Sequence, residues 1–146
     1  MKMSTKCRYG LRALADLALE GGNVPVPLSQ IAERQHLSVK YLEQEFASLR
    51  KAGFVRSVKG AQGGYLLALP ANEIIIADVI KQLEGDLLLV DEPVNDTDMT
   101  SLRRCLYDKL WQPLNAQIEQ EMESLDLAQL ISEWQGGSEE NPMYYI

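Results

Sequence analysis

The sequence has few of the residues that build disulfide frameworks or metal centres. It contains two cysteines, Cys7 and Cys105, and a single histidine, His36, among 146 residues. Two cysteines cannot supply the disulfide bonds that would stabilise a fold of this size. So few cysteines are typical of a protein in a reducing cytoplasm. A zinc site with four ligands from one chain would need carboxylates to complete it. We therefore expect no metal site and no cofactor.

Long apolar runs are also missing. None approaches the roughly 20 residues that a membrane-spanning helix needs, and no apolar signal core follows residues 1–6. These absences predict a cytoplasmic protein with no membrane partner. The composition, with 46% hydrophobic and 24% charged residues, is typical of one globular domain or of two small domains that share a core.

No catalytic set is apparent. His36 lies in a turn between two short predicted helices, and the sequence places no serine or cysteine nucleophile beside it. The glycine-rich turn at residues 59–64 is not a nucleotide-binding loop, because no Lys-Ser or Lys-Thr pair follows it and no helix opens after it. We predict that the chain is not an enzyme.

Charge is divided unevenly along the chain. The formal net charge is −7, yet residues 1–70 hold ten Lys or Arg against five Asp or Glu, and residues 71–146 hold four against sixteen. Such a split is typical of a nucleic-acid surface joined to an acidic region. A solvated surface whose charges segregated by chance is the alternative.

The first half predicts three helices followed by a hairpin. The helices are expected at residues 4–20, 29–35 and 39–52. Ser38 is a good N-cap for the third. Strands are expected at residues 54–58 and 65–69, on either side of the glycine-rich turn. This order predicts a mainly α fold with a small β-hairpin wing, a winged helix-turn-helix.

The second half predicts helices separated by a loop. A helix is expected at residues 76–83, a loop at 85–98, a long helix at 99–123 and a short last helix at 127–134. Pro113 should kink or divide the long helix. Residues 136–140 are polar and glycine-rich, so we expect them to be flexible. The predicted regions are a DNA-binding domain (1–84), a loop (85–98), dimerisation helices (99–135) and a flexible tail (136–146).

The long predicted helix carries an apolar stripe at a spacing of four. Its members are Leu102, Leu106, Leu110, Leu114, Ile118 and Met122. A helix of about 25 residues is near 37 Å long, which exceeds what the small first domain covers. The stripe either folds back on that domain or crosses to a second copy. Because paired DNA half-sites call for a two-fold dimer, we expect a homodimer.

The third predicted helix carries candidates for base reading. They are Lys40, Tyr41, Glu43 and Gln44, opposite the apolar stripe of that helix. In the major groove, Gln pairs with adenine, Glu accepts from cytosine and Lys reaches guanine or phosphate. Candidates for the wing and for phosphate contacts are Lys59, Gly60, Arg56, Lys6, Arg8 and Arg12. The alternative is that all of these are solvated surface residues.

Several segments resemble the Rrf2 family of bacterial winged-helix regulators, and the resemblance covers nearly the whole chain. The segments are residues 4–6, 8–11, 41–44, 49–53 and 58–65. The resemblance implies a homodimer that binds a palindromic operator in double-stranded DNA, with the long helix as dimer interface. It places Lys40, Glu43 and Gln44 in the base-reading turn and Lys59 at a minor-groove wing.

The cysteines depart from the cluster-binding members of that family. Those members carry three cysteines in and after the loop that here spans residues 85–98, and this loop has none. Cys105 resembles the third of them, and Asp108 stands where the iron–sulfur regulator has a histidine ligand. One thiolate leaves a cluster short of its usual four ligands. The alternative to a core or interface role for Cys105 is a redox or iron–sulfur sensing regulator that uses it.

The last residues resemble the C-terminus of the family's cysteine-metabolism repressor, which also ends in aromatic residues and isoleucine. They are Tyr144, Tyr145 and Ile146. The resemblance implies a repressor of cysteine or sulfur metabolism that is controlled by cysteine synthase (O-acetylserine thiol-lyase), whose partner enzyme offers a C-terminal isoleucine to its active site. Two alternatives remain. The tail covers an apolar patch on the regulator itself, or the protein inhibits cysteine synthase without binding DNA.

Overall fold

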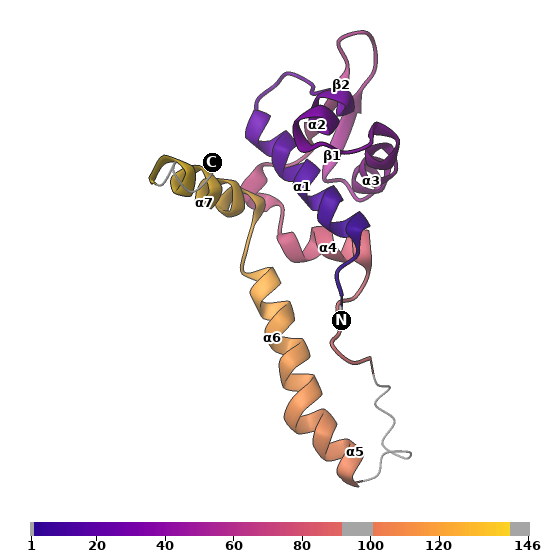
Figure 1. The fold of residues 1–146 in the computed structure, drawn as a ribbon, viewed down its shortest axis with the longest axis vertical. Helices are drawn as coiled ribbons and strands as arrows, with labels where there is room; N and C mark the ends of the chain where they lie inside the picture. The colour runs from indigo at the N-terminus through magenta and orange to yellow at the C-terminus, as the bar shows by residue number, and fades with distance from the viewer. Residues whose placement is uncertain (1, 92–100, 141–146) are drawn as a thin grey trace.

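The chain forms a helical body with a two-stranded hairpin, and a long helical arm projects from this body (Figure 1). The structure is a computed structural model that describes residues 2–91 and 101–140. The body contains α1 (Thr5–Glu20), α2 (Leu28–Gln35), α3 (Val39–Lys51), β1 (Val55–Val58), β2 (Gly64–Leu67), the 3-10 helix η1 (Ala71–Glu73) and α4 (Ile76–Glu84). The arm contains α5 (Ser101–Leu106), the π-helical turn η2 (Tyr107–Trp111) and α6 (Gln112–Glu123), and α7 (Leu127–Glu140) follows it. The predicted mainly α class with a β-hairpin is confirmed.

Serine caps begin the first and third helices. The Oγ of Ser4 accepts a hydrogen bond from the backbone N–H of Cys7 at 3.1 Å. The Oγ of Ser38 accepts from the backbone N–H of Tyr41 at 3.3 Å, as its predicted capping role requires. Between α2 and α3, His36 adopts a left-handed conformation with φ 56°. This residue ends α2 and turns the chain into α3.

The hairpin is antiparallel, with Val55 opposite Leu67 and Val58 opposite Gly64. Its strands are shorter than the sequence predicts. The backbone N–H of Phe54 donates to Leu49 at the end of α3 (3.0 Å) and its carbonyl accepts from Ala68 (2.9 Å), so Phe54 joins the end of α3 to the hairpin. The second strand starts at Gly64, where the backbone meets another segment of the chain.

Gly64 permits a close backbone approach beside the hairpin. Val26 and Tyr65 exchange backbone hydrogen bonds at 2.8 and 2.9 Å. A Cβ atom on Gly64 would lie 2.4 Å from the carbonyl carbon of Val26, and the φ of Gly64 is 156°. Glycine is thus required here by packing within the body.

The body is held together by the apolar faces of its helices. The largest fully buried apolar side chains are Phe46, Leu14, Ile31, Leu42, Leu49, Ile74 and Leu127. The ring of Phe46 contacts the ring of Tyr65 edge-on at 5.1 Å, which joins α3 to the hairpin. Asp16 is buried, and Arg34 pairs with it through two nitrogens at 2.6 and 3.1 Å. This pair joins α1 to α2.

The arm contains a π-helical turn immediately before Pro113. The backbone N–H of Gln112 donates to the carbonyl of Tyr107, five residues earlier. Pro113 has no N–H to donate, and its ring displaces the carbonyl four residues before it, so a widened turn accommodates it. The prediction that Pro113 disturbs the helix is confirmed. Neither the arm nor any other helix of the described residues is long and apolar enough to cross a membrane.

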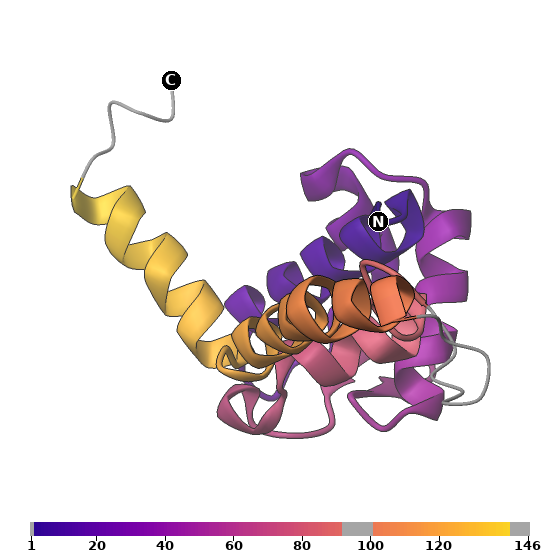
Figure 2. The ribbon, with the colours of Figure 1, turned by 90° about the horizontal axis from the view of Figure 1, so that it is seen from below.

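Only the end of the arm near α7 packs on the body. Met122 is half-buried against the core, and Lys81 of α4 pairs with Glu119 at 3.0 Å. The other end projects away from the body (Figure 1), and Figure 2 looks nearly along the arm, which lies in front of the body in that view. At the projecting end Leu102 is 71% exposed and Leu106 is 44% exposed. The stripe therefore does not fold back along its full length.

The predicted loop is tied to the arm. Residues 85–91 form no regular element, and residues 92–98 lie outside the described part of the chain. The side chain of Asn115 accepts a hydrogen bond from the N–H of Leu89 (2.6 Å) and donates to the carbonyl of Val90 (3.1 Å). This pair of bonds fixes the start of the loop against α6.

The last helix is longer than the sequence predicts. Asp126 and Gln129 cap its start reciprocally, each accepting a hydrogen bond from the other's backbone N–H (2.8 and 3.0 Å). The helix then continues to Glu140. Residues 136–140, which the sequence predicts to be flexible, are helical here, because two glycines weaken a helix by only about 1 kcal/mol each and no proline follows before Pro142. Residues 141–146 lie outside the described chain.

Candidate nucleic-acid interface

The predicted base-reading residues share the outer face of α3. Lys40, Glu43 and Gln44 are exposed, and Tyr41 is half-buried. The opposite face buries its apolar stripe, which begins at Leu42. These outward side chains near the N-terminus of α3 carry hydrogen-bond donors and acceptors of the kinds that can pair with base edges.

The hairpin presents a basic tip. Arg56, Lys59 and Gly60 are exposed, and the hairpin loop extends beyond the helices (Figure 1). Gly60 has φ 110° with open space around it, so its conformation and not crowding favours glycine. Arg50 at the end of α3 donates to Ser57 of β1 at 3.3 Å, which holds the wing against α3.

The predicted phosphate-binding residues of α1 lie near the start of α3. Lys6, Arg8 and Arg12 are all exposed. The guanidinium carbons of Arg8 and Arg12 lie 5.9 and 5.1 Å from the centre of the Tyr9 ring. The Tyr9 ring in turn contacts the ring of Tyr41 at 5.9 Å. One aromatic side chain thus joins the cations of α1 to α3.

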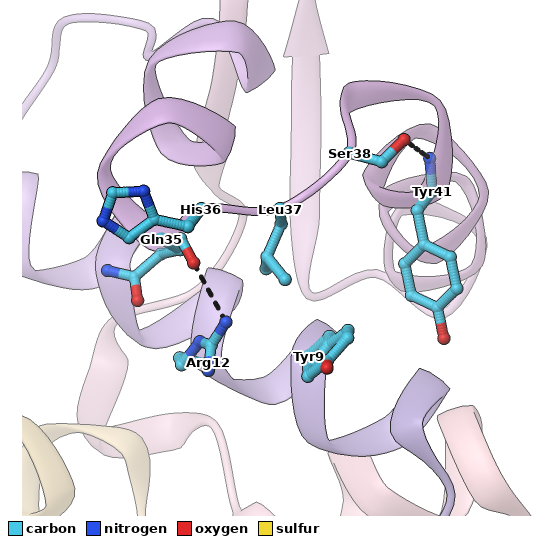
Figure 3. Close-up of a pocket in the computed structure, with 7 residues that line it drawn as sticks. All are labelled: Tyr9, Arg12, Gln35, His36, Leu37, Ser38 and Tyr41. Carbon is cyan, nitrogen blue, oxygen red and sulfur yellow. Dashed lines mark hydrogen bonds between the residues drawn. The ribbon is translucent and has the colours of Figure 1, made fainter.

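A concave surface separates α1 from the turn before α3. Its volume is about 470 Å³, and it is lined by Tyr9, Arg12, Gln35, His36, Leu37, Ser38 and Tyr41 (Figure 3). The guanidinium of Arg12 donates to the backbone carbonyl of Gln35 at 3.0 Å. Sequence reasoning did not single out Tyr9, and it considered His36 only as a catalytic or zinc-binding candidate. The signal for Tyr9 was its spacing of three from Arg12, which places both on one helix face.

A buried carboxylate lies on the inner face of α3. Glu45 is 1% exposed, and its Oε2 has no hydrogen-bond partner among the described residues. Burial raises the pKa of Glu45, and the charge of Lys6 opposes this only in part. Sequence reasoning missed Glu45, although it lies three residues after Leu42 and four before Leu49, on the buried stripe of α3.

The two cysteines occupy different environments. Burial, with Glu84 and Glu45 nearby, raises the pKa of Cys7 to about 11, so this thiol stays protonated and unreactive at neutral pH. Cys105 is exposed on α5. Within residues 2–91 and 101–140 no three His, Cys, Asp or Glu side chains gather as a metal site. Tyr144, Tyr145 and Ile146 lie outside the described residues.

Comparison with known proteins identifies the family. The sequence profile of Rrf2, described as an iron-dependent transcriptional regulator, matches residues 3–133. A putative HTH-type transcriptional regulator of Haemophilus influenzae is 39% identical over 90% of this chain and 87% of its own length. The HTH-type transcriptional regulator IscR of Photorhabdus laumondii is 41% identical over 90% of this chain and 80% of its own.

Solved structures agree with this assignment. CymR (YrzC), the global cysteine regulator of B. subtilis, superposes with a TM-score of 0.79 at 36% identity, over 91% of this chain and 98% of that one. IscR of T. potens superposes with a TM-score of 0.71 at 42% identity, over 91% of this chain and 88% of its own. The relatives are transcriptional regulators and not enzymes. The hairpin is accordingly the wing of a winged helix, and this chain belongs to the Rrf2 family of DNA-binding transcriptional regulators.

Proposed function

We propose that the protein is a dimeric, sequence-specific DNA-binding repressor of cysteine or sulfur metabolism. The observation that carries DNA reading is the exposed row of Lys40, Glu43 and Gln44 on α3, next to a basic wing. The likeness to the global cysteine regulator CymR supports the metabolic assignment. Under this proposal α3 enters the major groove, Lys59 reaches the minor groove, and the α1 cations contact phosphates.

Replacing Gln44 with Ala should weaken operator binding by about 1–3 kcal/mol, because a bidentate contact to adenine is lost. Lys59→Ala should instead reduce the slope of log K against log salt concentration by roughly one unit if its phosphate contact dominates. Fluorescence anisotropy with labelled operator measures both effects. Gln120→Ala, an exposed position on α6, is the matched control and should bind as wild type.

Unchanged operator affinity in both variants, with circular dichroism showing them folded, would contradict the recognition assignment. A wild-type protein that binds cysteine synthase but no DNA would instead be the interaction protein that only inhibits this enzyme.

We propose that the second copy of the chain covers the exposed end of the arm. Leu102, Leu106 and Leu110 are 71%, 44% and 40% exposed, and large apolar patches of this kind mark interaction surfaces. A groove of about 830 Å³ between α1, the end of α2 and α7 offers apolar side chains among polar ones such as Asp16 and Gln35, and Trp134 is 55% exposed in it. The apolar residues that line this groove are Leu11, Ala15, Leu19, Leu130, Ile131 and Trp134. We propose that it receives the arm of the partner.

We propose that cysteine synthase controls the repressor by binding its C-terminal residues. An aliphatic side chain next to a free carboxylate resembles an amino-acid substrate, and a backbone-amide pocket for such a substrate captures it. Tyr144, Tyr145 and Ile146 would then compete with O-acetylserine for the enzyme. Complex formation would report the supply of this cysteine precursor.

Deleting Ile146 should abolish binding to cysteine synthase while dimerisation and DNA binding persist, and O-acetylserine should dissociate the wild-type complex competitively. Isothermal titration calorimetry with the purified enzyme measures both. Binding of the truncated protein with wild-type affinity would refute enzyme docking. If truncation instead lowers the melting temperature of the regulator alone, the tail covers the regulator itself.

The second candidate function is iron–sulfur or redox sensing. The family's description as iron-dependent, the IscR relatives and the exposed thiol of Cys105 favour it. Under our main proposal, protein purified without oxygen is colourless, and Cys105→Ser keeps its DNA affinity under reducing conditions. A visible absorption band with stoichiometric iron and sulfide that disappears in Cys105→Ser would establish the second candidate instead.

A further inference from the structure

Glu45 lies on the buried face of α3, where this helix packs against α1 and α4 (Figure 1). Its side chain is 1% exposed, and its Oε2 has no hydrogen-bond partner among the described residues. The residue before it in the chain is Gln44, which the proposed function assigns to base reading. A carboxyl group with an unpartnered oxygen is therefore buried one residue away from the base-reading face.

The backbone of α1 and the last turn of α4 enclose this carboxyl group. A Cβ atom on Gly10 would lie 3.4 Å from Oε2 of Glu45 and 2.9 Å from Cδ1 of Leu83. Glycine thus lets α1 approach the carboxyl group closely, and the leucine beside it has no side-chain donor to offer. The amide of Gln82 donates to Oγ of Ser48 at 3.1 Å, which ties the same turn of α4 to α3.

The charged and titratable groups around Glu45 do not neutralise it. Lys6 of α1 is exposed, and its charge opposes the effect of burial on Glu45 only in part. Burial, with Glu84 of α4 and Glu45 nearby, raises the pKa of Cys7 to about 11. Burial also raises the pKa of Tyr41, so neither the thiol nor the phenol ionises near neutral pH. A change of charge at this junction near neutral pH therefore falls to Glu45.

The ionised form of Glu45 does not suit the closed junction. A buried carboxylate is costly unless hydrogen-bond donors or a cation compensate it, and Oε2 has no such donor. Burial accordingly raises the pKa of Glu45, so the proton stays on the carboxyl group at low pH and leaves as the pH rises. Because α1 and α4 close off Oε2, an ionised Glu45 regains water only if α3 moves away from them.

We propose that Glu45 is a positioning residue for DNA recognition: α3 packs in its operator-binding position while this carboxyl group is protonated, and loss of the proton displaces α3 and weakens operator binding. The proposal rests on the proposed DNA-binding function, because α3 carries Gln44 and its neighbours to the bases. Glu45 touches no base itself and acts through the position of its helix. A proton is thereby a ligand of each chain.

The first test measures operator affinity by fluorescence anisotropy from about pH 6 to about pH 8 at constant ionic strength. One linked proton per chain changes affinity by up to about tenfold per pH unit, and two chains by up to about a hundredfold. We expect wild-type affinity to fall by at least about tenfold over this range. Glu45→Gln copies the size and neutrality of the protonated form, so it should keep its low-pH affinity throughout. Glu73→Gln removes an exposed carboxylate of η1 and should follow wild type.

Random DNA separates an effect on α3 from a general effect of charge. Displacement of α3 should weaken operator binding more than binding to random DNA, because base contacts and not phosphate contacts are lost. The ratio of the two affinities should therefore fall with rising pH in wild type and stay constant in Glu45→Gln. Circular dichroism at each pH verifies that the proteins are folded, and Glu45→Leu, which is also neutral, replaces Glu45→Gln if the latter does not fold.

The second test counts protons. Calorimetric titration of the operator near pH 8, in two buffers with different ionisation enthalpies, gives the number of protons taken up on binding. Wild type should take up about one proton per chain more than the neutral variant. If neither neutral variant folds, wild type decides alone, and operator binding without proton uptake would then overturn the proposal.

Each remaining outcome has a distinct meaning. Equal pH profiles in wild type and Glu45→Gln would overturn the proposal while leaving operator recognition intact. An affinity of Glu45→Gln that is lower by the same factor at every pH would overturn it too, since Glu45 would then serve packing alone. Equal losses on operator and random DNA would exclude an effect through α3. A wild-type protein with no operator preference at any pH would defeat the proposed function itself.

Discussion

Replacing Leu106 and Leu110 with lysine should convert the protein into a monomer that has lost operator binding. Both side chains are about two-fifths exposed on the projecting part of the arm. In a two-fold dimer each substitution acts twice. Fully burying a leucine contributes about 1.5–3 kcal/mol, and the two-fifths that remain exposed here contribute about 0.6–1.2 kcal/mol each. The four lost leucines of the dimer therefore remove roughly 2.5–5 kcal/mol of association free energy, which weakens dimerisation by at least about fiftyfold.

Analytical ultracentrifugation over a concentration series measures the association, and anisotropy measures operator binding on the same samples. Gln112→Lys is the matched control, because Gln112 is exposed on the same arm but two residues away from Leu110, on the opposite helix face. We expect it to remain dimeric. If the double variant sediments as a dimer, the arm is not the interface.

Replacing Glu45 with Leu should stabilise the protein, and more so at high pH. Glu45 is buried, with Oε2 unpartnered among the described residues. An unsatisfied buried polar group costs about 1–3 kcal/mol, and more when it is charged. We therefore expect the free energy of unfolding to rise by at least about 1–3 kcal/mol near pH 8. Each kcal/mol raises the melting temperature of a chain of this size by about 2–4 °C.

The pH dependence follows from the direction of the pKa shift. Burial raises the pKa of Glu45 in the folded protein, so the folded state binds a proton that the unfolded state releases. The stability associated with this proton is complete below the ordinary glutamate pKa and is lost as pH rises through the raised pKa. The benefit of Glu45→Leu should accordingly grow from pH 4 to pH 8.

Urea unfolding followed by circular dichroism at both pH values measures this difference. Glu43→Leu is the matched control, because Glu43 is exposed two residues away, and we expect its effect on stability to stay within about 0.5 kcal/mol. A loss of stability in Glu45→Leu, or a gain that does not depend on pH, would contradict a burial-driven shift of the Glu45 pKa.

Local signals in the sequence predict the elements of the body well. Ser38 marks the start of α3, and the spacing of Leu42, Phe46 and Leu49 identifies its buried face. The glycine-rich segment at residues 59–64 predicts the hairpin, because glycines favour the tight turns that connect two antiparallel strands. Each of these signals acts within a few residues, which is why a single sequence reveals them.

Features that depend on distant contacts could not be read in the same way. The continuation of α7 through two glycines runs against intrinsic propensity, and this helix packs against α1. The link between Arg12, Tyr9 and Tyr41 spans two helices. The orientation of those side chains depends on how α1 packs against α3.

The most direct test of the central claim is selection of bound sequences from a random DNA pool by the full-length protein, followed by measurement of its stoichiometry on the enriched site. A sequence-specific dimer should enrich a palindrome and bind it as two chains per site, with Gln44→Ala relaxing the preference at one position of each half-site. Recovery of no preferred sequence, or of a site bound by one chain, would contradict the account.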